Sequence, residues 1–270
     1  MSANAALPDH VKALTFDVFG TIVDWRSSVE SVLRDTFRKK IASPQFSSLS
    51  ADLQARVRAV ADTDVAKFAQ EWRNAYSSFT KGFVPGTTPW KDVDAHHYDS
   101  LVEQLNRWQL AGLFADDEEG VRSLSLVWHR LTPWADSADG IRRLGARFVT
   151  ATLSNGNQEL LRDLADFGNL GFARIISAAD FHAYKPHPSV YLGAADRLGV
   201  KPADIAMVAA HLNDLEAAKN AGLRTVYIER PGEEAWKKDE ERYRAAKDWV
   251  DVWVGQGEDG VREVAARLGL

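Results

Sequence analysis

The sequence predicts an α/β fold, in which a Rossmann-like parallel sheet carries an inserted helical domain. Three observations lead to this prediction. After Pro133, short apolar runs alternate with helical stretches, which is the order of βαβ units in a parallel sheet covered on both faces. A separate apolar run at 13–17 ends in an acidic residue and opens into a loop. Between that run and Pro133, apolar residues recur at helical spacing with no intervening strand.

The individual elements follow from these patterns. Strands are predicted at 13–17, 147–153, 173–177, 205–209, 225–229 and 250–254. Helices are predicted in the first half at 27–41, 51–76, 94–108 and 118–131, and between the later strands at 157–168, 189–199 and 214–222. The first strand must join the later sheet, because alone it would bury nothing. We therefore expect a core of 1–24 with 131–270, and a helical cap, 25–130, over the carboxyl edge of the sheet, where such sheets bind ligands.

Composition excludes several classes of function. The 270 residues carry a net charge of −5, which gives no reason to expect nucleic acid or an anionic membrane as a partner. The absence of cysteine excludes disulfides, thiolate catalysis and cysteine-bound metals. The N-terminal stretch 1–17 shows no signal peptide, and no apolar run approaches the ~18 residues of a membrane span. We expect a soluble cytoplasmic protein, and its nine tryptophans and apolar helix faces leave a homodimer open.

Four short motifs follow one another along the predicted core. They are LTFDVFGTIVDW at 14–25, LSNGN at 153–157, YKPHPSVY at 184–191 and VAAHLNDLEAA at 208–218. Together they resemble the haloacid dehalogenase (HAD) superfamily, most closely its 2-haloacid dehalogenase (type II) branch. The resemblance covers essentially the whole core, whereas the cap resembles that branch only in being helical and similarly placed. It implies a HAD-type sheet, a hydrolase that acts on carbon–halide bonds, and no cofactor.

The first motif supplies the candidate nucleophile. An aspartate at a strand end, Asp17, can form a covalent ester intermediate, although an Asp in this position is more often a turn or helix cap. Thr21 either orients that carboxylate or caps the loop. The resemblance favours the catalytic alternative.

Two positions distinguish the branch. Phosphatases of the superfamily carry a second aspartate where this chain has Phe19, and that acid protonates the leaving alcohol. A halide is a weak base that needs no proton, whereas general acid catalysis contributes ~10²–10⁴-fold to ester cleavage. The magnesium-binding acid of the fourth motif is replaced by Ala210, and magnesium needs carboxylate oxygens. We therefore predict no metal and a small haloacid substrate, with Phe19 as an apolar wall.

The second and third motifs supply the other substrate contacts. By resemblance, Ser154 and Asn155 bind the substrate carboxylate and the halide, although Ser-Asn-Gly is also an ordinary turn. Lys185 resembles the lysine that pairs with the nucleophile, and an ammonium within ~4–6 Å would keep Asp17 ionised. Tyr191 matches the tyrosine that supports this lysine, or else packs one helix face.

The fourth motif departs from the branch. Asp214 is predicted to orient or deprotonate the water that hydrolyses the ester, with a helix N-cap as the alternative. The branch has serine, asparagine and tryptophan where this chain has Ala209, His211 and Asn213. His211 either replaces the asparagine as a polar contact or helps to activate water, and a structural histidine is an equal alternative.

In the resembled branch, an arginine of the cap binds the departing halide, so the resemblance implies a cation there. Arg73 and Lys81 are both candidates, with Arg73 assigned, and simple spacing from Trp72-Arg73 places the expected position near Lys81 or Phe83. A cation on a solvated helix face is the commoner case. The resulting hypothesis is displacement of halide from a 2-haloacid by Asp17, followed by ester hydrolysis to the 2-hydroxy acid. The alternatives are a phosphatase or phosphonatase of the same fold, and a non-catalytic binding protein that retains the core.

Overall fold

The structure of the chain, a computed structural model, describes residues 6–270. It forms two compact units: the described residues up to Asp24 together with Thr132–Leu270, and Trp25–Leu131. Residues 1–5, which begin the predicted segment 1–24 and the stretch considered for a signal peptide, lie outside the described residues. None of the helices formed by residues 6–270 is long and apolar enough to cross a membrane.

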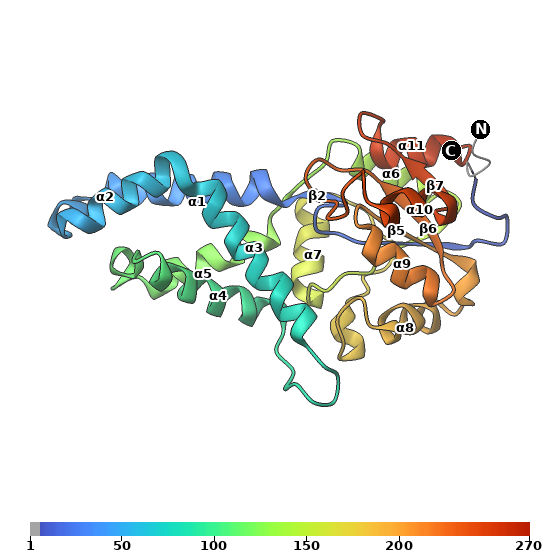
Figure 1. The fold of residues 1–270 in the computed structure, drawn as a ribbon, viewed down its shortest axis with the longest axis horizontal. Coiled ribbons are helices and arrows are strands. Elements are labelled where there is room, and N and C mark those ends of the chain that lie inside the picture. Colours follow the sequence, from blue (N-terminus) through green and yellow to red (C-terminus); the bar gives the residue numbers. More distant parts are fainter. Residues whose placement is uncertain (1–5) are drawn as a thin grey trace. The chain divides into compact units, whose positions relative to one another are not determined.

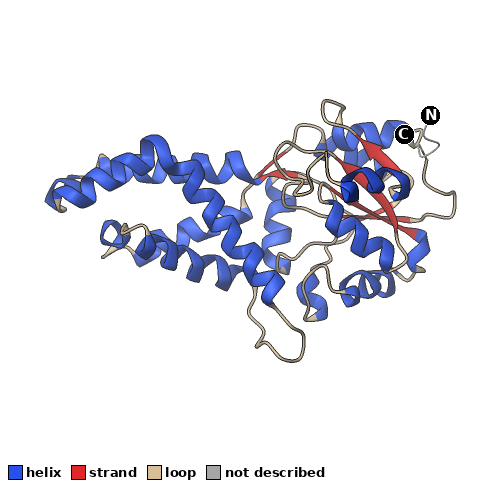
Figure 2. Cartoon of the chain, in the orientation of Figure 1, coloured by secondary structure: helices blue, strands red, loops and turns tan. Residues whose placement is uncertain are grey.

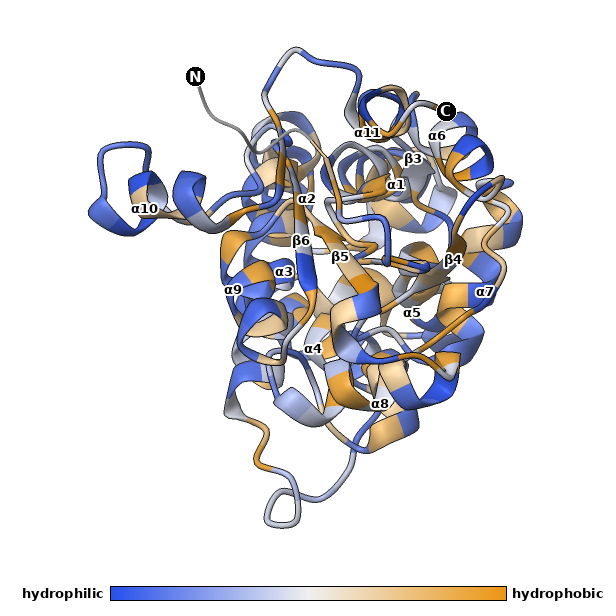
Figure 3. Cartoon of the chain, turned by 90° about the vertical axis from the view of Figure 1, so that its right-hand side faces the viewer, coloured by the Kyte–Doolittle hydropathy of each residue, from blue (hydrophilic) through white to orange (hydrophobic). Residues whose placement is uncertain are grey.

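The first unit is built on a five-stranded parallel sheet (Figures 1 and 2). Its order is β4 (Val149–Thr152), β1 (Ala13–Phe16), β5 (Ile205–Ala209), β6 (Arg224–Ile228) and β7 (Val252–Val254). The first strand lies inside the sheet and pairs in parallel with both β4 and β5. Every residue of β1 and β5 is buried, as expected of central strands covered on both faces. Figure 3 shows apolar colour on β5.

Helices and short turns cover this sheet. The α-helices of the unit are α6 (Ser137–Leu144), α7 (Gln158–Phe167), α8 (Pro188–Leu198), α9 (Leu212–Asn220), α10 (Glu241–Trp249) and α11 (Gly260–Arg267). Two 3₁₀ turns, η5 (Ala178–Phe181) and η6 (Pro202–Asp204), precede α8 and β5. A two-stranded antiparallel ribbon, β2 (Val23–Asp24) with β3 (Thr132–Pro133), forms where the chain leaves and re-enters the unit.

The prediction of a regular strand at 173–177 is wrong. The segment makes only isolated parallel bridges, Ala151 with Arg174 and Ser154 with Ser177. Threonine hydroxyls replace part of the backbone ladder, because Thr152 Oγ1 accepts from the backbone N–H of Ile176 at 2.9 Å and donates to its carbonyl at 3.0 Å. The segment therefore follows β4 without completing a sixth strand.

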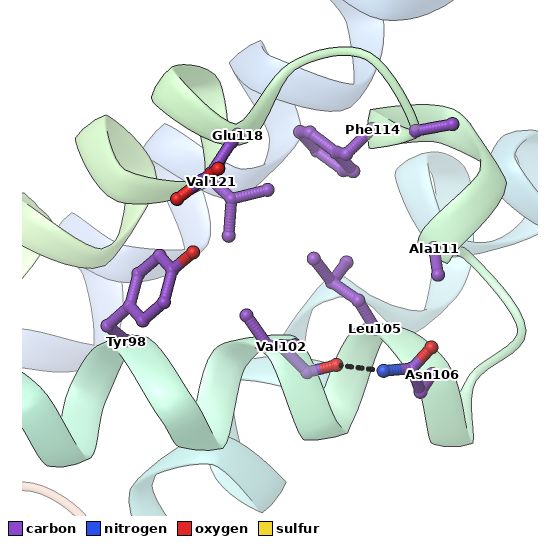
Figure 4. Close-up of a pocket in the computed structure, with 9 residues that line it drawn as sticks. Tyr98, Val102, Leu105, Asn106, Ala111, Phe114, Glu118 and Val121 are labelled. Atoms are coloured by element: carbon purple, nitrogen blue, oxygen red, sulfur yellow. Dashed lines mark hydrogen bonds between the residues drawn. The ribbon is translucent and has the colours of Figure 1, made fainter.

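The second unit is helical. It contains α1 (Trp25–Ile41), α2 (Ala51–Ala59), α3 (Val65–Gly82), α4 (Val93–Arg107) and α5 (Glu118–Ser125), with 3₁₀ turns η1 (Pro44–Ser48), η3 (Ala111–Phe114) and η4 (Leu126–His129). The single helix predicted at 51–76 is interrupted by a π-helical turn, η2 (Val60–Asp64). Side chains of α4, η3 and α5 line a small hollow within this unit (Figure 4).

A buried ion pair anchors the edge of the sheet that carries the motifs. Arg230 follows β6, and its guanidinium binds both oxygens of Asp136, at 2.8 and 2.7 Å. The same guanidinium donates through Nε to the backbone carbonyl of Thr21 at 3.1 Å, and Asp136 also accepts from the backbone N–H of Val261 at 2.6 Å. Four segments distant in the sequence are thus fixed around one charged pair.

Removing one member of this pair should destabilise the fold. Asp136→Ala leaves the Arg230 guanidinium buried without its carboxylate, which costs about 3–5 kcal/mol in comparable pairs. We expect urea denaturation to show a loss of that order. Asp139→Ala, on the same helix, removes a carboxylate that pairs with the exposed side chains of Arg142 and Arg143, and we expect little change. Equal losses in the two variants would contradict this account.

Candidate active site

The motif residues converge at the carboxyl edge of the parallel sheet. Asp17 directly follows β1, Ser154 lies two residues after β4, and His211 lies two residues after β5. Because parallel strands end at the same edge, side chains from separate motifs meet there. The structure also brings Lys185, from the loop before α8, and Asp214, from the first turn of α9, into this group.

Asp17 accepts three side-chain hydrogen bonds. Lys185 Nζ lies 2.8 Å from Oδ1. Thr21 Oγ1 and His211 Nδ1 lie 2.8 and 3.1 Å from Oδ2. Burial raises the pKa of the Asp17 carboxyl, but the Lys185 ammonium and His211 outweigh this effect and hold the pKa below its ordinary value of 3.8. The group is a buried carboxylate at neutral pH.

Lys185 joins this carboxylate to a second one. Its ammonium also donates to Asp214 Oδ2 at 2.5 Å, and Tyr191 donates its hydroxyl to Asp214 Oδ1 at 2.6 Å. Burial raises the pKa of Asp214; the Lys185 ammonium opposes this shift and the nearby Asp17 charge adds to it. Asp214 is therefore more basic than an ordinary aspartate. Asn155 holds the lysine in place, because its Oδ1 accepts from the Lys185 backbone N–H at 2.7 Å.

His211 lies between two carboxylates. Its Nδ1 contacts Asp17, and its Nε2 lies 3.2 Å from Glu233 Oε2. Burial lowers the pKa of the imidazole, but the hydrogen bonds to Asp17 and Glu233 raise it overall, from 6.5 to about 10. At neutral pH the ring is a cation that donates from both nitrogens, which is a poor state for a base.

The remaining predicted residues of the core lie around this group. Thr21 Oγ1 accepts from the Ala210 backbone N–H at 2.9 Å, so its hydroxyl proton is directed to Asp17. Ser154 is buried, and within residues 6–270 its Oγ has no hydrogen-bond partner. Phe19 is buried as well, and its ring lies against Gly156, where an added Cβ would come within 3.3 Å of Phe19 Cε2. The role of Phe19 as an apolar wall for the substrate stays a prediction.

One interpretation needs correction. Asp214 is not the N-cap of α9, because the helix begins at Leu212 with His211 in the capping position. The Asp214 side chain instead binds Lys185 and Tyr191. The Tyr191 hydroxyl contacts Asp214 rather than the lysine itself, so any support it gives to Lys185 passes through that carboxylate.

Glu233 is a site residue that sequence reasoning missed. It lies in the segment after β6, at the same sheet edge as the predicted residues. An acid-rich stretch, ERPGEE at 229–234, begins at the last residue of the strand predicted at 225–229. The strand-end criterion, applied to this stretch, would have found Glu233.

Arg73 belongs to the helical unit. Its guanidinium lies over the ring of Tyr76 at 4.5 Å and of Trp25 at 5.5 Å, all within that unit. Contact between Arg73 and a substrate at Asp17 therefore stays a prediction. Lys81 and Phe83 lie in and just after the last turn of the same helix, α3.

The charge of His211 should make stability depend on pH. Because its folded-state pKa is raised from 6.5 to about 10, protonated His211 contributes stability that is fully present below pH 6.5 and lost as pH rises through about 10. The stability of the wild type relative to His211→Asn should fall across this window, as measured by urea denaturation at successive pH values. A difference independent of pH would contradict the assigned charge.

Comparison with known proteins places the chain in a family. The sequence model of the haloacid dehalogenase-like hydrolase family matches residues 11–222. (S)-2-haloacid dehalogenase 4A of Burkholderia cepacia is 26% identical over 231 residues, which cover 83% of this chain and 85% of that protein. (S)-2-haloacid dehalogenase 1 of Pseudomonas sp. (strain CBS-3) is 39% identical over 107 residues, covering 38% of this chain and 47% of that protein.

The solved structures agree with these sequence matches. A crystal structure of a defluorinating L-2-haloacid dehalogenase superposes with a TM-score of 0.74 at 30% identity, covering 96% of each chain. A second L-2-haloacid dehalogenase gives a TM-score of 0.73 at 30% identity and covers 95% of this chain and 99% of its own. With a family model that matches most of its length, a parallel sheet of the same fold and an ionised aspartate after the first strand, the chain belongs to the haloacid dehalogenase-like hydrolase family.

Proposed function

We propose that the chain is a metal-independent hydrolytic dehalogenase, which converts a small 2-haloacid to the 2-hydroxy acid through an ester of Asp17. The observation that carries this proposal is the pairing of Asp17 with Phe19. Asp17 is a buried, ionised carboxylate, and Phe19 stands two residues later, where a proton-donating acid would be needed. A carboxylate can displace halide without a proton donor, whereas cleavage of a phosphate ester benefits strongly from one. The named relatives act on (S)-2-haloacids.

In the first half-reaction, Asp17 attacks the halogen-bearing carbon. An ester C–O bond forms as the C–X bond breaks, and the halide leaves with the bonding electrons. Ser154 Oγ, buried and without a hydrogen-bond partner in the described part of the chain, is suited to donate to the substrate carboxylate. Asn155 and Arg73 are the candidates for receiving the halide. The helical unit acts as a cap that excludes bulk water during this step.

In the second half-reaction, water attacks the carbonyl carbon of the ester. Asp214 takes a proton from that water, for which its raised pKa is suited. The ester bond breaks, the 2-hydroxy acid leaves with a proton returned by Asp214, and the Asp17 carboxylate is restored. Overall one water is consumed, and one halide and one proton are released.

Lys185 supports both steps. It neutralises part of the charge shared by Asp17 and Asp214, and its ammonium stays protonated because those carboxylates, acting against burial, raise its pKa. No group of three or more acidic or histidine side chains in residues 6–270 is arranged to hold a metal ion, and the proposed steps use none.

Halide release in the presence of a chelator tests this proposal. Wild-type protein should release chloride from chloroacetate with EDTA present, and Asp17→Asn should release none, because an amide is a poor nucleophile. Asp24→Asn, in strand β2 at the end of the same motif, serves as a matched control and should release chloride as the wild type does. Magnesium-dependent release of phosphate from a phosphate monoester, without release of halide, would contradict the proposal and favour a phosphatase.

A further inference from the structure

We infer that His211, held by Glu233, is the charged donor of an oxyanion hole that acts in ester hydrolysis, and that Glu233 is the residue that positions it. The inference rests on the proposed function, since it concerns the second half-reaction of the Asp17 ester. It assigns a role to His211, which stands where the resembled branch has a neutral asparagine, and a second role to Glu233, which contacts it.

The two oxygens of Asp17 are held differently. Each carboxylate oxygen has two lone pairs. Oδ2 accepts from both Thr21, at 2.8 Å, and His211, at 3.1 Å, so both of its lone pairs are engaged. Oδ1 accepts from Lys185 alone among the described residues and keeps one lone pair for attack. Oδ1 therefore becomes the ester oxygen, and Oδ2 becomes the carbonyl oxygen.

This assignment places two donors on the oxygen that gains charge during hydrolysis. When water adds to the carbonyl carbon, the π electrons move onto Oδ2, which becomes an oxyanion. The Thr21 hydroxyl and His211 Nδ1–H already point at it. When the intermediate collapses, those electrons re-form the carbonyl and the bond from Cγ to Oδ1 breaks. Donors preorganised in this way lower the barrier, because they need no rearrangement as the charge develops.

Glu233 becomes essential when the ester forms. In the resting site, His211 faces two carboxylates, Asp17 and Glu233, while Lys185 contacts the other oxygen of Asp17. Esterification removes the charge of Asp17, and Glu233 is then the one anion of the core unit's described residues that contacts the ring. Its carboxylate keeps His211 protonated in the state in which the oxyanion forms.

Glu233 is itself held in place. Its Oε2 lies over the α-carbon of Gly20, where an added Cβ would come within 2.0 Å of that oxygen, and Gly20 has a φ of +82°. The neighbouring Glu234 accepts from the backbone N–H of Leu212 at 2.7 Å, and Arg230 is fixed to Asp136. The segment after β6 is thus bound to the loop after β1 and to the start of α9, and these contacts hold Glu233 beside His211.

A single-turnover experiment separates the two half-reactions. Protein in excess is mixed with chloroacetate and quenched, and mass spectrometry follows the carboxymethyl ester on Asp17. Glu233→Gln keeps the size of the side chain and removes its charge. We expect ester formation at close to the wild-type rate and ester decay slowed about tenfold or more, since loss of a whole oxyanion-hole donor costs ~10²–10³-fold. Glu229→Gln removes a charge that pairs with Lys238 in the same segment and should leave both rates unchanged.

The pH dependence distinguishes loss of charge from loss of structure. Without Glu233, His211 loses its proton at a lower pH, so the deficit of Glu233→Gln in ester decay should shrink as the pH is lowered toward 6.5 and grow as it rises. In a His211→Asn background, where the donor is neutral, Glu233→Gln should have no further effect on decay.

The outcomes are separable. Suppose that the wild type releases halide, but the ester on Glu233→Gln decays at the wild-type rate or its slower decay is independent of pH. The inference is then overturned while the proposed function stands. Equal slowing of ester formation and decay would also overturn it, because that result indicates a structural role. If the wild type forms no ester and releases no halide, the proposed function fails, and the inference fails with it.

Discussion

The site depends on one ammonium group shared by two buried carboxylates. Lys185 lies within 2.8 Å of Asp17 and 2.5 Å of Asp214, and without it the two acids could not both be ionised in a buried site. The three residues come from the loop after β1, the loop before α8 and the first turn of α9. The same interaction therefore fixes the geometry of the sheet edge. Lys185 lowers the pKa of both acids, but burial and the Asp17 charge still leave the pKa of Asp214 above its ordinary value, whereas Asp17 stays well below its own.

A second cation extends this arrangement. His211 adds a positive charge on the other side of the Asp17 carboxylate, and Glu233 balances it. Three carboxylates and two cations then alternate across the site, and each cation contacts two acids. This alternation explains how so many charges are tolerated out of water, and it predicts that removing any one of them affects its neighbours' protonation as well as its own contact.

The sequence predicted the parts of the site that depend on strand ends. Asp17, Ser154 and His211 follow strands whose apolar runs are unambiguous, and parallel pairing then brings them to one edge. It did not predict that His211 would be protonated, because the partner responsible, Glu233, lies 22 residues away in a loop without a regular pattern. The segment 173–177 was mistaken for a strand because its apolar pattern is that of one, whereas the threonine hydroxyls that bond to its backbone lie on β4. The π-helical turn inside 51–76 interrupts a helix without breaking its apolar spacing, so periodicity could not reveal it.

The covalent role of Asp17 is the claim on which the mechanism depends. A single turnover of chloroacetate in ¹⁸O-labelled water, with protein in excess, tests it most directly. Hydrolysis of the ester at its carbonyl carbon leaves the label in the Asp17 carboxylate, and mass spectrometry of the peptide that contains residues 13–17 should detect it there, with unlabelled glycolate as the product. Label in glycolate and none in Asp17 would mean that water attacks the substrate directly, and would contradict the account.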